Sequence, residues 1–200
     1  MGRAISFGFS KFFENIGPLL ILALVAVGAQ IVLSLLGQFV FTGVVSQLML
    51  NVLSFVVSSV LAIALIRACL DIVDGRSPDL NRAFSLDNVG QYILASIIFG
   101  IAVGVGLVLC ILPGLAVLLL FGLFGYFIID RGLDGIDGLK ASFDVAKRNI
   151  GPLIVLYLAA IAIAIIGLAL CCVGLIPASA IIGIATAHAY RQLTGGYIAG

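Results

Sequence analysis

The string NIGPLLIL at residues 15–22 returns almost unchanged as NIGPLIVL at residues 149–156, and a weaker copy, NVGQYIL, occupies residues 88–94. Each copy stands where charged sequence gives way to a long apolar stretch. These stretches run for 52, 42 and 42 residues without a charge, and all 10 basic and 9 acidic residues lie between or beyond them. The chain therefore consists of three copies of a repeated unit, at about residues 3–75, 77–135 and 136–195.

Each uncharged stretch is long enough to cross a membrane twice. A helix needs about 20 apolar residues to span about 30 Å of hydrocarbon, so each stretch predicts a helical hairpin. The expected spans are 16–36, 44–70, 89–109, 113–129, 150–170 and 175–191. The fold class that follows is an all-α membrane protein in one membrane domain, with six transmembrane helices arranged as three parallel-repeat hairpins.

A short amphipathic stretch precedes each hairpin. Apolar residues recur at helical spacing in 5–16 and 136–150, and residues 77–79 (Ser-Pro-Asp) provide a helix start for the second unit. We expect these stretches to form helices lying in the membrane interface. The chain must then turn into each span, where Gly tolerates unusual dihedrals and Asn can satisfy freed backbone groups. The expected hinges are Asn15 and Gly17, Asn88 and Gly90, and Asn149 and Gly151.

Composition and charge exclude several classes of protein. With 63% hydrophobic and 10% charged residues, the chain lies outside the range of soluble domains. A net charge of +1 and the lack of a basic run argue against nucleic acid, because phosphate binding needs clustered Lys and Arg. All the Lys and Arg fall on one side of the predicted spans, so that side and both termini are expected in the cytoplasm.

Two rows of uncharged polar residues in the first hairpin are the best site candidate. In its second helix these side chains fall within about 60° of one another at 100° per residue. One interpretation is hydrogen bonding between the two helices, at about 0.6 kcal/mol per contact. The other is a polar cavity for a small ligand, or a docking face for another subunit. The residues are Gln30, Ser34 and Gln38 in the first helix and Gln47, Asn51, Ser54 and Ser58 in the second.

Acidic residues on the charged side offer hard oxygen ligands for a divalent cation. They are Asp71, Asp74, Asp130, Asp134 and Asp137. Phosphatidyltransferases of the CDP-alcohol type use a D-G-x-x-A-R run, but here the Ala and Arg positions after the Asp134-Gly135 pair hold Gly and Leu. Pairing with neighbouring arginines accounts for these carboxylates equally well. We therefore expect no catalytic residue, no metal and no cofactor.

Two further features have both a functional and a packing interpretation, and a third has a packing interpretation alone. Cys110 and Cys171 are equivalent positions of two repeats and could form a disulfide on an oxidising side, or remain buried free thiols. His188, the only histidine, could relay protons or simply pack. Gly100 and Gly104 form a GxxxG pair, which we expect to mark close helix packing.

Three segments carry a resemblance to a known group: ILPGLAVLLLF (111–121), GLKASFDVAKRN (138–149) and AHAYRQLTG (187–195). They resemble an uncharacterised family of bacterial six-helix inner-membrane proteins, related to the membrane domain attached to some glycerophosphodiester phosphodiesterases. The resemblance implies that Pro113-Gly114 opens the fourth helix, that Ser142 lies in an amphipathic helix, and that Tyr190-Arg191 closes the last span. It also implies a location in the bacterial inner (plasma) membrane, and it carries no assigned activity.

These observations predict a non-enzymatic protein, an accessory or structural subunit or a lipid-interacting scaffold of a membrane complex. The partners expected are membrane lipids and either another membrane protein or further copies of the chain. The alternative is a small-molecule transporter or substrate-binding membrane component, similar in size to the six-helix substrate-binding subunits of vitamin transporters. That alternative requires the face of Gln47, Asn51 and Ser54 to line a cavity.

Overall fold

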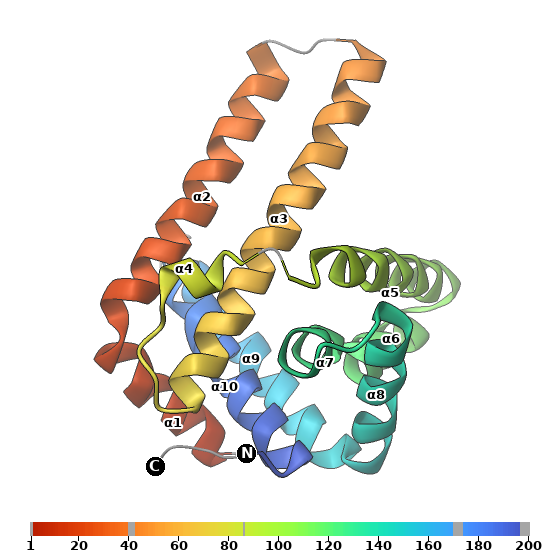
Figure 1. The fold of residues 1–200 in the computed structure, drawn as a ribbon. Coiled ribbons are helices and arrows are strands. Elements are labelled where there is room, and N and C mark those ends of the chain that lie inside the picture. The colour runs from red at the N-terminus through yellow and green to blue at the C-terminus, as the bar shows by residue number, and fades with distance from the viewer. Residues whose placement is uncertain (1, 40–42, 86, 170–173, 197–200) are drawn as a thin grey trace.

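The structure is a computed structural model that describes residues 2–39, 43–85, 87–169 and 174–196. These residues form helices and the turns between them (Figure 1). Within these described residues, five helical segments are long and apolar enough to cross a membrane, which makes the chain a multi-pass membrane protein in its general character. They are α2 (Ile16–Phe39), α3 (Val44–Val73), α5 (Val89–Leu109), α6 with α7 (Ile111–Phe121 and Phe124–Arg131) and α9 (Ile150–Ala169).

The sixth long helix, α10 (Leu175–Thr194), is not among these five. Its last turns carry His188, Arg191 and Gln192, which lower its mean hydropathy. It is nevertheless the central helix of the molecule, in contact with α1, α2, α3 and α9. Its buried face runs from Ala178 to Tyr190. The expected boundaries of all six long segments agree with the observed helices to within three residues.

The α2–α3 hairpin projects from the rest of the molecule. Figure 1 shows the two helices side by side, with no other helix beside their far half. Side chains near the tip are accordingly exposed, with Val44 at 80% and Met49 at 70%. The long helices do not all run parallel, because α5 lies crosswise to this hairpin in the same view. The first expected hairpin, α2–α3, therefore stands apart from the other long helices over its far half.

The amphipathic stretches pack against other helices of the chain. α1 (Gly2–Glu14) lies along α10, where a Cβ at Gly8 would come 3.0 Å from the carbonyl oxygen of Ile181. α8 (Gly135–Arg148) packs on α5, α6 and α7, and Gly138 allows it to approach Ile128. The second unit has only a single turn, α4 (Leu80–Ala83). Two of the three expected amphipathic helices are therefore full helices that pack on other helices of the chain, and the described part of the third is a single turn.

Candidate functional site

The C-terminal ends of α3, α7 and α10 meet in a network of charged groups. Arg191 on α10 donates from Nε and Nη2 to the two carboxylate oxygens of Asp74, at 3.0 and 2.9 Å. Its Nη1 donates to Oδ2 of Asp130, at 2.8 Å, and the same oxygen accepts a 2.8 Å bond from the Tyr190 hydroxyl. We call Asp74, Asp130, Tyr190 and Arg191 the charged junction. It joins α3, α7 and α10 at their charged ends.

The geometry of the junction is that of a strong interaction. The side chains of Asp74, Asp130 and Arg191 are only 12%, 17% and 16% exposed, and the guanidinium engages Asp74 in a two-pronged fashion. Bidentate, charge-assisted bonds of this kind are about twice as strong as neutral ones. Tyr190 is fixed from behind, since its ring packs edge-on to Phe127 with 5.0 Å between centroids. The junction therefore fixes the ends of α3, α7 and α10 with respect to one another.

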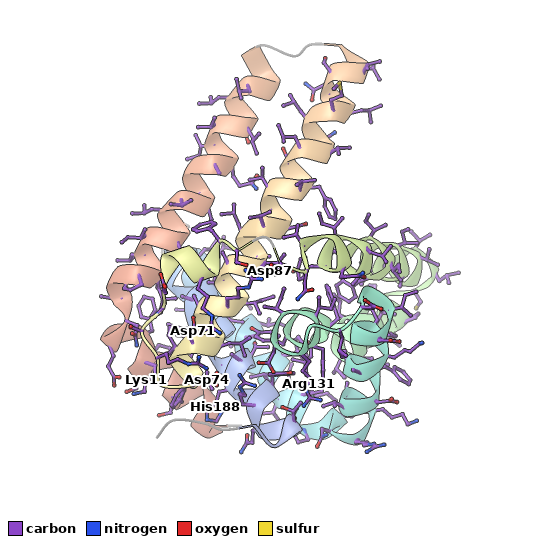
Figure 2. The ribbon with its side chains drawn as sticks, viewed as in Figure 1. Lys11, Asp71, Asp74, Asp87, Arg131 and His188 are labelled. Carbon is purple, nitrogen blue, oxygen red and sulfur yellow. The ribbon has the colours of Figure 1, made fainter. Side chains whose placement is uncertain are left out.

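A second layer of arginines surrounds the junction. Arg76 pairs with Asp74 at 2.9 Å, and Arg82 approaches Asp71 at 3.6 Å. Arg67 donates to the backbone carbonyl of Arg82 in α4 and to those of Ser85 and Asp87 in the α4–α5 connection. Figure 2 shows Asp71 and Asp74 on the last turns of α3, with Asp87 farther up the same side. Together the charged groups border a polar cavity of about 140 Å³.

Four of the five carboxylates considered as metal ligands have basic partners. Asp71, Asp74 and Asp130 face arginines, and Asp137 pairs with Lys140 at 3.2 Å. Asp134 precedes α8, where its carbonyl accepts the first helical bond from Gly138. Within the described ranges no group of three His, Cys, Asp or Glu is placed to hold a metal ion. The arrangement is that of an ion-pair network, in which arginine charges offset the carboxylates.

Some of the polar residues of the first hairpin form hydrogen bonds between α2 and α3. Gln30 Nε2 donates to Ser58 Oγ at 2.7 Å, and Gln47 Nε2 donates to the Gly37 carbonyl at 3.0 Å. Ser58 and Ser59 each donate to a backbone carbonyl one turn earlier. We call Gln30, Ser34, Gln47, Asn51, Ser54 and Ser58 the polar seam. The side chain of Gln38 lies outside the part of the structure that is described.

The three asparagine hinges occupy equivalent places. Each precedes a long helix and accepts its first backbone bond, from Leu19, Tyr92 and Leu153 respectively. Asn15 and Asn149 also donate from Nδ2 to a carbonyl four residues earlier, at 3.2 and 2.9 Å. The second hinge differs because Asn88 itself takes a left-handed conformation, with φ of 63°.

The glycines of the hinges have no comparable role. A Cβ at Gly17, Gly90 or Gly151 would meet nothing within 4 Å, and none of the three has a positive φ. The expectation that these glycines permit a special turn was therefore wrong. Left-handed glycines occur instead just after the C-terminal ends of α3, α7 and α10, where Gly75, Gly132 and Gly195 have φ of 78°, 63° and 70°.

A break between α6 and α7 escaped sequence analysis. Gly122 lies at this break, and a Cβ there would overlap the Tyr157 hydroxyl oxygen. The buried hydroxyl of Ser142 on α8 donates to the Leu120 carbonyl and accepts from the Leu123 N–H, at 3.1 and 3.2 Å. It thus satisfies backbone groups that the break releases. The signals were a Gly inside an apolar run and a small polar residue on the apolar face of α8.

The remaining candidates have structural surroundings. His188 is buried and its ring contacts Phe7 of α1, with 4.8 Å between centroids. Cys110 is an exposed free thiol, whereas Cys171 lies outside the described residues. Gly100 and Gly104 face open space, so close packing does not explain them. The close approach within this hairpin occurs at Gly106, where a Cβ would lie 2.9 Å from the backbone of α6.

Comparison with known proteins places the chain beside uncharacterized mycobacterial proteins. It is 32% identical over 141 residues to the uncharacterized protein Rv2560 of Mycobacterium tuberculosis, a match that covers 67% of this chain and 41% of the relative. The uncharacterized protein Mb2590 of Mycobacterium bovis matches with the same identity and coverage. The chain thus spans well under half the length of the curated relatives it matches. No family model matches it, and no solved structure matches it significantly.

Proposed function

We propose that the chain is a non-enzymatic, multi-pass protein of the bacterial plasma membrane that serves as an accessory subunit or lipid-interacting scaffold of a membrane complex. The observation that carries the proposal is the projecting α2–α3 hairpin. Its far half has no other helix beside it and exposes large apolar side chains such as Val45, Leu48 and Val52. Such an exposed apolar face is suited to contact with lipid hydrocarbon or with another membrane protein.

The proposed topology has six spans in three repeated hairpins, with both termini in the cytoplasm. α10 is the sixth span, supported by its length of 20 residues and its central position. The equivalent places of Asn15, Asn88 and Asn149 support the repeat. The charged junction, at the charged end of each hairpin, supports a common cytoplasmic side, since Lys and Arg are retained there.

A structural role accounts for the charged groups better than catalysis does. The junction carboxylates accept bonds from Arg191, and Asp74 and Asp71 also face the arginines of the surrounding layer. Ser142 is likewise occupied by two backbone bonds. On its motifs alone, we also propose a relation to the membrane domain attached to some glycerophosphodiester phosphodiesterases. The residues of those motifs include Ser142, which lies at the α6–α7 break, and Tyr190 and Arg191, which belong to the charged junction.

A carrier or binding function is the second candidate, favoured by one observation. A pocket of about 610 Å³ opens between α1, α2, α9 and α10, which is within the range of small-molecule sites. Its lining is apolar, with Phe9, Phe12, Leu20, Ile166 and Ile181 among its residues. This version of the alternative differs from the one expected, because the polar seam is not part of that lining. The ligand it would suit is a hydrocarbon chain rather than a polar molecule.

Purification in native nanodiscs, followed by mass spectrometry of everything retained, tests the two functions. A stoichiometric protein partner, or a defined set of retained phospholipids, is the result expected for the subunit or scaffold. A single retained small molecule, lost when Ile166→Trp fills the apolar pocket, would overturn that function in favour of the carrier. Leu158→Trp, at an equally exposed position elsewhere on α9, is the matched control.

A further inference from the structure

We propose that the polar seam is the interface with a second copy of this chain, so that two α2–α3 hairpins pack together in the membrane. This inference rests on the proposed membrane location. It extends the proposed function by naming the partner and the surface that binds it. Three observations carry it: polar groups left exposed at membrane depth, more surface than a compact monomer has, and the chemistry of the exposed groups.

Hydrogen bonds join α2 to α3 across the polar seam at two levels along the hairpin, and exposed polar side chains lie between these levels. Gln30 with Ser58 closes one level, and Gln47 with the Gly37 carbonyl closes another nearer the tip. Between these levels Ser34 on α2 and Asn51 on α3 are exposed. Within the described part of the chain the Asn51 amide makes no hydrogen bond. An amide at this depth is unfavourable in hydrocarbon unless it finds a partner, and lipid tails provide none.

The molecule also exposes more surface than a compact chain of its mass. Its accessible surface is 10,589 Å². A compact monomer of 20.8 kDa is expected to expose about 8,900 Å², which leaves an excess of about 1,700 Å². A stable interface removes about 800 Å² from each partner. The projecting hairpin is a source of this excess, so burying part of it suffices for a dimer.

The chemistry of the seam selects a copy of itself. No charged residue occurs between Glu14 and Arg67, so no charge in this hairpin can choose an oppositely charged partner. An asparagine amide both donates and accepts, and it is therefore complementary to the same amide across a two-fold axis. Single buried asparagines fix the register of paired helices in this way. An axis near Asn51 brings the two open segments of the seam together and leaves the apolar outer faces to lipid.

Measurement of the oligomeric state of the full chain tests the proposal. The purified protein is expected to be a dimer in dodecyl maltoside by sedimentation equilibrium and in nanodiscs by native mass spectrometry. Asn51→Leu should raise the dimer dissociation constant about tenfold, the loss of two equivalent polar contacts between membrane helices. Met49→Leu is the matched control. It lies on the opposite side of the same helix, is also exposed, and should leave the constant unchanged.

Cross-linking keeps the test independent of how the variants fold. With the native cysteines replaced by serine, Asn51→Cys should form a disulfide-linked dimer in membranes treated with copper phenanthroline, whereas Met49→Cys should not, because a disulfide requires Cα atoms within about 7 Å. A monomeric protein, or a dimer indifferent to Asn51→Leu, would overturn the proposal. A monomer retained with a different protein would overturn it too, but would leave the subunit function standing.

Discussion

Replacement of Arg191 by methionine should be among the most destabilising single changes in this chain. The substitution keeps most of the side-chain volume but removes three charge-assisted bonds, at 3.0, 2.9 and 2.8 Å, and leaves the carboxylates of Asp74 and Asp130 facing each other. Breaking a fully buried pair in this way costs about 3–5 kcal/mol. The junction carboxylates are 12% and 17% exposed, so we expect a loss of about 3 kcal/mol.

Equilibrium unfolding in mixed micelles, from dodecyl maltoside toward SDS, measures this loss. Arg76→Met is the matched control, because Arg76 pairs with the same Asp74 at the same 2.9 Å but is 56% exposed, and it should cost no more than about 1 kcal/mol. Adding Asp130→Asn to Arg191→Met should recover part of the stability, since it removes an uncompensated charge. Equal losses for Arg191→Met and Arg76→Met would refute the reasoning, as would a double variant less stable than the single one.

Three further changes are expected to have distinct results. Gly106→Ala should destabilise the protein by about 1–3 kcal/mol in the same assay, because its Cβ would meet the backbone of α6. Gly104 on the same helix faces open space, so Gly104→Ala should stabilise the protein by about 0.5–1 kcal/mol. If Gly104→Ala were the more destabilising of the two, the packing described for Gly106 would be contradicted. Ser142→Ala should lower the free energy of unfolding by about 1–3 kcal/mol, because it removes two buried hydrogen bonds. Ser179 is exposed and makes one local bond, so Ser179→Ala should lower it by less than about 1 kcal/mol. Similar losses for the two variants would contradict the role of Ser142 at the α6–α7 break. In a variant whose other cysteines are serine, a membrane-impermeant maleimide should label Cys110 in intact spheroplasts, and labelling only after permeabilisation would reverse the proposed orientation.

Much of the secondary structure could be predicted because hydrocarbon imposes one local rule. An apolar run of about 20 residues must be helical to satisfy its own backbone, so the start of α2 at Ile16 and of α9 at Ile150 followed from where charge ends. The interruption at Gly122 could not be predicted in the same way. It is stabilised by Ser142, 19 and 22 residues along the chain from its two partners, and nothing local to the break indicates a partner on another helix.

The candidate site was predictable only in its ingredients. Asp130 and Tyr190 are 60 residues apart, and their contact depends on how α7 and α10 pack. Arg191 and Asp74 are 117 residues apart, a separation over which no sequence pattern links two side chains. Glycine spacing misled for the same reason. Gly100 and Gly104 have the packing motif, but the direction in which α5 faces its neighbours decided that Gly106 makes the contact.

The charged junction also sets the order in which the molecule can be completed. Chains are made from the N-terminus at about 5–20 residues per second, so Asp74 precedes Arg191 by about 6–23 s. During that interval the first and then the second hairpin exist while the guanidinium that will join their ends has not been synthesised. Asp74 has only the more exposed Arg76 beside it in the meantime. The junction is thus a latch that only the last helix can close, and a chain stopped before α10 remains open at the place where its hairpins should meet.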